Sequence, residues 1–266
     1  MLLAHGNEAI SPGPDIQQRI SDATTQTAIN AGTAGGYYRL LDAHDAYAAK
    51  LGLHLTPSLA SSIEWAAVDP AVNRPWRDGP GFNRRLGALA EAGTVEIVGS
   101  TFADAPLAYF DASWLADNVA LSHRFLTEIY GTAPSSRVFW VPERVYDDGV
   151  MSRVAGLGYT HVFVDQFRHI LDRFGRQAAL LDDGYRINRF NGLNAMVIND
   201  QASSFRFRNT DRGLDINLRQ LLSRKSRSGE QHQLVIFYSD LSDFRNAADA
   251  TAYDRNLAWL ASRPWV

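Results

Sequence analysis

The segment VFWVPERVY, residues 138–146, places four bulky apolar residues before a proline and a lone carboxylate, Glu143. Pro142 has no N–H to donate to a strand ladder, so we expect a buried strand that ends at residue 141. Residues 148–157 then have the apolar spacing of a helix, which Gly158 is expected to end. A strand followed by a helix predicts a parallel β-α unit, with Glu143 on the connecting loop.

The same alternation of strand and helix recurs along the chain. About seven such units in one domain favour an α/β barrel with mostly parallel strands over an open doubly wound sheet. The first strand is followed by HGNE, residues 5–8, and not by a glycine-rich nucleotide-binding turn. The expected strands are residues 2–4, 53–56, 95–98, 138–141, 162–164, 185–189, 196–198 and 234–238, and the expected helices are residues 15–31, 37–51, 82–92, 113–130, 148–157, 214–224 and 252–262.

Composition removes several classes of function. The 266 residues carry a net charge of -3, which gives no electrostatic reason to expect nucleic acid or an anionic membrane as a partner. The chain has no cysteine, so disulfides, a thiolate nucleophile and cysteine-ligated zinc are excluded. The sequence contains neither a signal-peptide pattern nor an apolar run long enough for a bilayer, so a cytoplasmic protein is expected.

A barrel predicts that function lies on the loops after the C-terminal ends of its strands. Polar and acidic side chains follow five of the expected strands. These residues are His5 and Glu8, Asp104, Glu143 and Arg144, Asp165 to His169, and Asp240 with Asp243.

Two of these carboxylates, Glu143 and Asp240, each stand alone at the end of an apolar strand. Either could cap the following helix, since acids are favoured at helix N-termini. Ser242 and Asp243 could cap the last helix equally well, which leaves Asp240 available for chemistry. Two carboxylates from different strands match the acid/base and nucleophile pair of glycoside hydrolysis, and they would also fit a metal site.

The seven histidines contain no HxxxH or HExxH pair, so a zinc-protease or two-histidine metal site is not expected. His5, at the end of the first strand, is the best candidate for a hydrogen bond to substrate, and His169 is the second. We expect His44, His123 and His161 to be surface or helix-packing residues.

Four segments, in this order, resemble glycoside hydrolase family 57, which includes amylases, glucanotransferases and branching enzymes that act on α-glucans. They are GTVEIVG (residues 93–99), FWVPERV (139–145), residues 157–166, and YSDLSDF (238–244). The resemblance implies an incomplete (β/α)7 barrel, no cofactor, and an oligo- or polysaccharide substrate. It implies that Glu143 is the nucleophile of a retaining mechanism and that Asp240 is the general acid/base. The rim positions and the matching segments together predict substrate-binding roles for His5, Glu8, Glu96, Asp104, Trp140, Arg144, Asp165, Gln166, His169 and Asp243.

Some positions depart from the family pattern. The family's opening H-x-H segment keeps only His5, Ala105 replaces a histidine, and Ser242 replaces a glutamate. Residues 1–266 are expected to form a single barrel domain without the family's C-terminal helical domain. The alternatives are a glycan-binding barrel without turnover, and a metal-dependent barrel like polysaccharide deacetylases or α-mannosidases that would use His5, Asp104 and Asp240.

Overall fold

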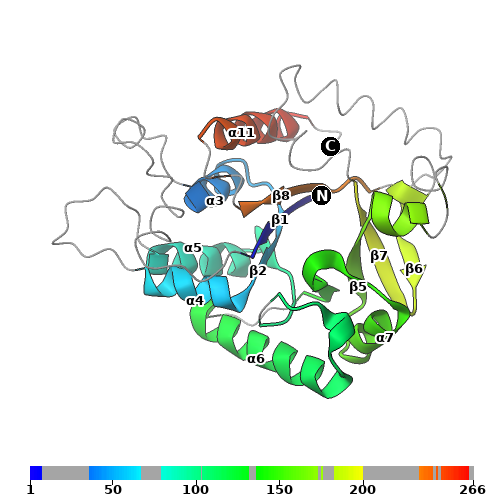
Figure 1. The fold of residues 1–266 in the computed structure, drawn as a ribbon. Coiled ribbons are helices and arrows are strands. Elements are labelled where there is room, and N and C mark those ends of the chain that lie inside the picture. The colour runs from blue at the N-terminus through cyan, green and yellow to red at the C-terminus, as the bar shows by residue number, and fades with distance from the viewer. Residues whose placement is uncertain are drawn as a thin grey trace.

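Parallel strands surrounded by helices form the computed structural model of the chain (Figure 1). It describes residues 1–7, 36–66, 79–102, 104–131, 136–172, 175, 183–199, 234–241, 244 and 247–263. One sheet has the order β3-β2-β1-β8 and the other the order β4-β5-β7-β6. The first contains β1 (Leu2–Gly6), β2 (Leu51–Leu55), β3 (Val95–Ile97) and β8 (Phe237–Asp240), and the second contains β4 (Val138–Phe139), β5 (His161–Asp165), β6 (Asn188–Phe190) and β7 (Leu193–Ile198).

The two sheets continue into each other at Gly99. This residue forms a parallel bridge with Phe139, and its carbonyl accepts a hydrogen bond from the N–H of Trp140 at 2.8 Å. On the other side, the Asn199 side chain after β7 accepts the N–H of Ile236, just before β8, at 2.9 Å. Seven parallel strands therefore follow the order β8-β1-β2-β3-β4-β5-β7, and β6 pairs antiparallel with β7. The predicted α/β fold with mostly parallel strands is confirmed.

The helices lie outside the strands (Figure 1). Helix α11 packs against α3, while α4, α5 and α6 pack against one another. The helices are α3 (Gly36–Ala46), α4 (Pro57–Trp65), α5 (Gly79–Glu91), α6 (Ala112–Tyr130), α7 (Asp148–Gly156) and α11 (Ala247–Ala261), with the short turns η1 (Leu107–Tyr109), η2 (Pro142–Arg144), η3 (Gln166–Ile170, a π-helix) and η4 (Asp183–Tyr185). Within the described residues, no helix has the length and apolar character needed to cross a bilayer.

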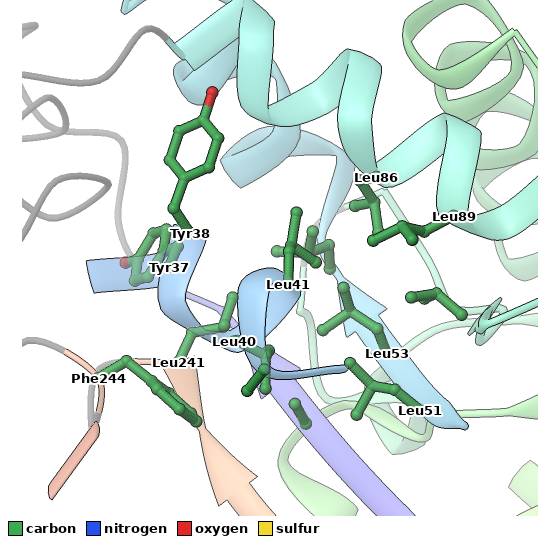
Figure 2. Close-up of a cluster of buried hydrophobic side chains, with 14 of the residues drawn as sticks. Tyr37, Tyr38, Leu40, Leu41, Leu51, Leu53, Leu86, Leu89, Leu241 and Phe244 are labelled. Atoms are coloured by element: carbon green, nitrogen blue, oxygen red, sulfur yellow. The ribbon is translucent and has the colours of Figure 1, made fainter. Parts of the chain in front are cut away.

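Side chains that alternate along the strands build two kinds of core. Leu51 and Leu53 of β2 face outward and pack with α3 and α5, together with Leu241 and Phe244 near β8 (Figure 2). The residues in the intervening register face inward instead. The inward core consists of Leu3, Val98, Trp140, Phe163, Met196, Ile198, Ile236 and Tyr238.

Helix α4 was not among the expected elements, because Pro57 was interpreted only as the end of a strand. Proline is also favoured in the first turn of a helix, and the Thr56 hydroxyl accepts the N–H of Leu59 as an N-cap. The helix expected at residues 37–51 ends at Ala46, since Leu51 already belongs to β2.

Further boundaries differ from the expectation. The strand expected to end at residue 141 ends at Phe139, β7 begins at Leu193 and not at residue 196, and α11 begins at Ala247 and not at residue 252. Residues 185–189 were expected as one strand, but η4 ends at Tyr185 and β6 begins at Asn188. The last strand starts at Phe237 and not at residue 234. The helices expected at 15–31 and 214–224 lie outside the described residues.

Gly99→Ala should destabilise the junction between the sheets. A Cβ at this position would lie 2.5 Å from the Tyr159 hydroxyl and 2.6 Å from a ring carbon. Overpacking of this kind costs about 1–3 kcal/mol, which urea denaturation would measure. Gly156→Ala is the matched control, because a Cβ there meets nothing within 4 Å. Equal stability of the two variants would contradict the close packing at Gly99.

Candidate active site

The inward columns of β1, β5 and β8 each end in a polar side chain at the C-terminal rim. His5 stands two positions after Leu3, Asp165 two after Phe163, and Asp240 two after Tyr238. Because side chains alternate with period two, each polar group shares the face of the apolar residue below it. The pairing of β1 and β8 places His5 directly beside Asp240 in register.

At this rim and just beneath it lies a layer of nearly parallel rings, here called the aromatic floor, formed by Trp140, His5, His54 and Tyr238. The Trp140 side chain is only 2% exposed. Its ring is stacked with His5 at 4.4 Å between centroids and with His54 at 5.4 Å. Tyr238 lies nearly parallel to Trp140, at 5.8 Å and 7°. The floor therefore joins β1, β2 and β8 to the segment that carries Glu143.

Asp104 is held above one edge of the floor. Its Oδ2 accepts a hydrogen bond from Asn7 Nδ2 at 2.7 Å and lies 3.8 Å from His5 Nε2. Burial, and then the negative charge of Glu143, raises the pKa of Asp104 to about 7, while the Asn7 hydrogen bond and Arg144 oppose that shift. Glu143 and Asp104 therefore share one electrostatic environment.

The Arg144 side chain lies over the aromatic floor and extends to Asp165 of β5. Its guanidinium carbon lies 5.8 Å from the Trp140 ring centroid and 5.2 Å from that of Tyr238, within cation–π range. Its Nη1 is 3.3 Å from Asp165 Oδ1. The Tyr238 hydroxyl in turn donates a hydrogen bond to Asp240 Oδ1. A continuous set of contacts thus runs from the Glu143–Arg144 turn to Asp240.

The backbone at Glu143 is strained. Glu143 and Arg144 have φ values of 52° and 51°, the left-handed region that residues with a Cβ avoid. Each such residue costs about 1–2 kcal/mol. The turn η2 holds Glu143 exposed at the rim instead of letting the chain continue into α7. Strain concentrated at one position is typical of functional sites.

The π-helix η3 turns His169 away from the barrel mouth. His169 Nδ1 accepts the N–H of Asp165 at 2.8 Å, and its ring meets Tyr146 edge-on. Burial lowers the pKa of His169 to about 4, so the ring is neutral near pH 7. It lines a cavity of about 330 Å³ whose lining includes neither Glu143 nor Asp240 among the described residues. His169 therefore orients the Asp165 backbone, and Gln166 beside it is fully buried.

A comparison of the sequence with models of known protein families identifies the family of the chain. The model of the family described as Glycosyl hydrolase family 57 matches residues 81–259. The chain belongs to glycosyl hydrolase family 57. This is a family of retaining glycosidases and transferases that act on α-glucans. No curated protein matches the chain.

Solved structures share the fold at low sequence identity. The 4-alpha-glucanotransferase from Thermococcus litoralis is 15% identical with a TM-score of 0.72, and the match covers 99% of this chain and 38% of that one. The family 57 branching enzyme from Thermococcus kodakaraensis is 12% identical with a TM-score of 0.58, covering 99% of this chain and 68% of that one. A putative polysaccharide deacetylase from Mycobacterium smegmatis is 14% identical with a TM-score of 0.57, covering 99% and 84%. The chain thus spans 38% of the length of the glucanotransferase.

Not every residue predicted from the family 57 pattern lies with this cluster. Glu96 is exposed in the middle of β3 and pairs in register with Gly52, which is level with Leu3. His5 and His54 stand two positions further along their strands, so Glu96 faces the opposite end of the barrel. Glu8 and Asp243 lie outside the described residues.

The roles of three residues of the site were not predicted. His54 contacts His5, Asn7 holds Asp104, and Tyr238 holds Asp240. His54 could have been found from the alternation in LGLHL, residues 51–55, where it is the polar residue on the inward face at the strand end.

His44 and His123 pack from helices, as expected, whereas His161 belongs to strand β5 and His232 lies outside the described residues. His44 Nε2 is 2.7 Å from the Tyr253 hydroxyl, and His123 Nε2 is 2.7 Å from the Tyr159 hydroxyl. His161 contacts Asn194 across the β5–β7 pair. Across the described part of the chain, no group of three or more His, Asp or Glu side chains is arranged to hold a metal ion. His5, Asp104 and Asp240 thus do not form the cluster that the metal-dependent alternative requires.

The wild-type protein should lose stability through Asp104 as the pH rises from about 4 to about 7, and the Asp104→Asn variant should not show this loss. The folded protein holds a proton on Asp104 up to about pH 7, whereas the unfolded chain releases it near 3.8, the ordinary pKa of an aspartate. The wild-type free energy of unfolding therefore falls, through this group, as the pH rises across that window. The variant should gain on the wild type from pH 4 to 7 and keep its advantage above pH 7.

Urea denaturation of both proteins at a series of pH values measures this difference. The buried histidines titrate in both proteins, so their contribution largely cancels in the comparison. Parallel stability curves would show that the Asp104 carboxyl titrates alike in the folded and unfolded states.

Proposed function

We propose that the chain acts on an α-glucan as a retaining glycosidase or glucanotransferase, with Glu143 as nucleophile and Asp240 as general acid/base. The observation that carries the proposal is the set of contacts Arg144–Tyr238–Asp240, which links the strained Glu143 turn to Asp240 across the aromatic floor. Family membership supports the choice of substrate class.

The first half-reaction forms a covalent intermediate. A Glu143 oxygen attacks the anomeric carbon as the glycosidic C–O bond breaks, and the leaving oxygen takes the proton of Asp240. Tyr238 donates a hydrogen bond to Asp240 Oδ1, which fixes the orientation of the carboxyl group. Arg144 follows the nucleophile in the chain, and its guanidinium lies over the Tyr238 ring, next to the group that orients Asp240.

The second half-reaction restores the enzyme. Asp240, now ionised, takes a proton from water or from an acceptor hydroxyl, whose oxygen attacks the anomeric carbon and releases Glu143. Two inversions give net retention. Water as acceptor makes the enzyme a hydrolase, and a second sugar chain makes it a transferase.

The other residues of the site bind the sugar or support the residues that bind it. His5 Nε2 and Asp104 lie at the same edge of the floor, where they can meet sugar hydroxyls. Trp140 is too deeply buried to stack on a sugar ring directly, so its contribution is to hold the His5 and Tyr238 rings in place.

Glu143→Gln should lower kcat on maltooligosaccharides by at least about a thousandfold, because the amide cannot form the glycosyl-enzyme. Binding of the oligosaccharide should change only slightly, since size and shape are kept. Product chain lengths, separated by chromatography, measure turnover, and titration calorimetry measures binding. Glu128→Gln makes the same change at an exposed position on α6 and should leave both quantities unchanged.

Equal turnover in Glu143→Gln and the wild type would exclude Glu143 as the nucleophile. Binding without turnover in the wild type would favour a glycan-binding barrel instead. Release of acetate from an acetylated glycan, with no change in chain length, would favour the deacetylase alternative.

A further inference from the structure

His54 is a fully buried histidine at the end of β2, and it makes one hydrogen bond that constrains its protonation. Its Nδ1 lies 2.7 Å from Nδ1 of His5, its register partner on β1. The two rings are nearly coplanar, with an angle of 8° between them, and both lie against the Trp140 indole. A hydrogen bond between two Nδ1 atoms needs a proton on one and a lone pair on the other.

The surroundings decide which ring donates. His54 Nε2 is buried and has no hydrogen-bond partner among the described residues. If His54 accepted at Nδ1, its proton would sit on Nε2 as an unpaired buried donor, which is costly. In that case His5 would also turn a bare Nε2 lone pair toward Asp104 Oδ2, 3.8 Å away.

The opposite arrangement leaves a nitrogen lone pair instead of an N–H at the buried His54 Nε2, and it turns the His5 N–H toward the Asp104 oxygen. His54 then carries its proton on Nδ1 and donates to His5, and His5 carries its proton on Nε2, toward Asp104. Burial lowers the pKa of His5 to about 3 and lowers that of His54 as well, so both rings are neutral near pH 7. Neither ring is therefore a doubly protonated imidazolium at neutral pH, and each carries one proton.

We propose that His54 is a positioning residue that fixes His5 in the Nε2–H tautomer and presents this N–H as a hydrogen-bond donor to a sugar hydroxyl oxygen at the rim. The part that concerns substrate rests on the proposed function. The part that concerns the two rings stands on the geometry alone. The neutral Nδ1–H tautomer of His54 is the less common one in free histidine, so its presence would be specific evidence.

Nitrogen NMR of the histidine-labelled protein tests the ring pair directly. We expect His54 to be protonated at Nδ1 and His5 at Nε2, with a scalar coupling across the N–H···N bond between the two Nδ1 atoms. Loss of the His5 signals in a His5→Gln variant assigns them. Protonation of His54 at Nε2, or the absence of the coupling, would overturn the proposal whatever the enzyme's activity.

Two variants test the consequence for substrate. His54→Asn keeps an N–H donor near the Nδ1 position, whereas His54→Leu keeps volume but removes the donor. We expect His54→Leu to lose about tenfold in kcat/KM and His54→Asn to recover most of that loss, with both variants folded by circular dichroism. Equal losses in the two variants would make His54 a packing residue only. If the wild type does not turn over glycan, the proposed function fails, and the NMR result alone still decides the role of His54.

Discussion

The inward-facing, buried indole of Trp140 is the contact on which the rest of the site depends. It lies beneath His5 and His54 from β1 and β2, and beside Tyr238 from β8. His5 and Tyr238 then reach the two carboxyl groups on either side, Asp104 and Asp240. Because Trp140 stands three residues before Glu143, the same segment positions both the aromatic floor and the candidate nucleophile. Packing and chemistry are thereby joined in one short stretch of chain.

The site is costly to maintain, and its neighbours offset the cost. Two consecutive left-handed residues, Glu143 and Arg144, oppose folding by about 1–2 kcal/mol each. The Arg144 contacts with Asp165 and with two aromatic rings stabilise that turn. A buried carboxyl with a pKa of about 7 adds a further cost above neutral pH. Groups that oppose stability and gather at one place are typical of functional sites.

The sequence was informative where a signal is local. Apolar runs that end in a carboxylate located Glu143, Asp165 and Asp240 at strand ends, because strand period and strand termination depend on nearby residues. The alternation in LGLHL could have placed His54 on the inward face of β2, but its partnership with His5 depends on the register between two strands, which no local pattern encodes. Glu96 was assigned from a motif, but its place within β3, before the strand end, puts it at the other end of the barrel. The turn of His169 toward the outer cavity follows from the π-helix, whose extra residue per turn the apolar spacing does not reveal.

Trapping the covalent glycosyl-enzyme tests the role of Glu143 most directly. A ring-fluorinated α-glucosyl fluoride should react with the protein and form an intermediate whose release is slow. Mass spectrometry of the digested protein should then find one added glycosyl group on the peptide that contains Glu143. A glycosyl group on another carboxylate, or steady consumption of the fluoride with no group on that peptide, would contradict the assignment of Glu143 as the nucleophile.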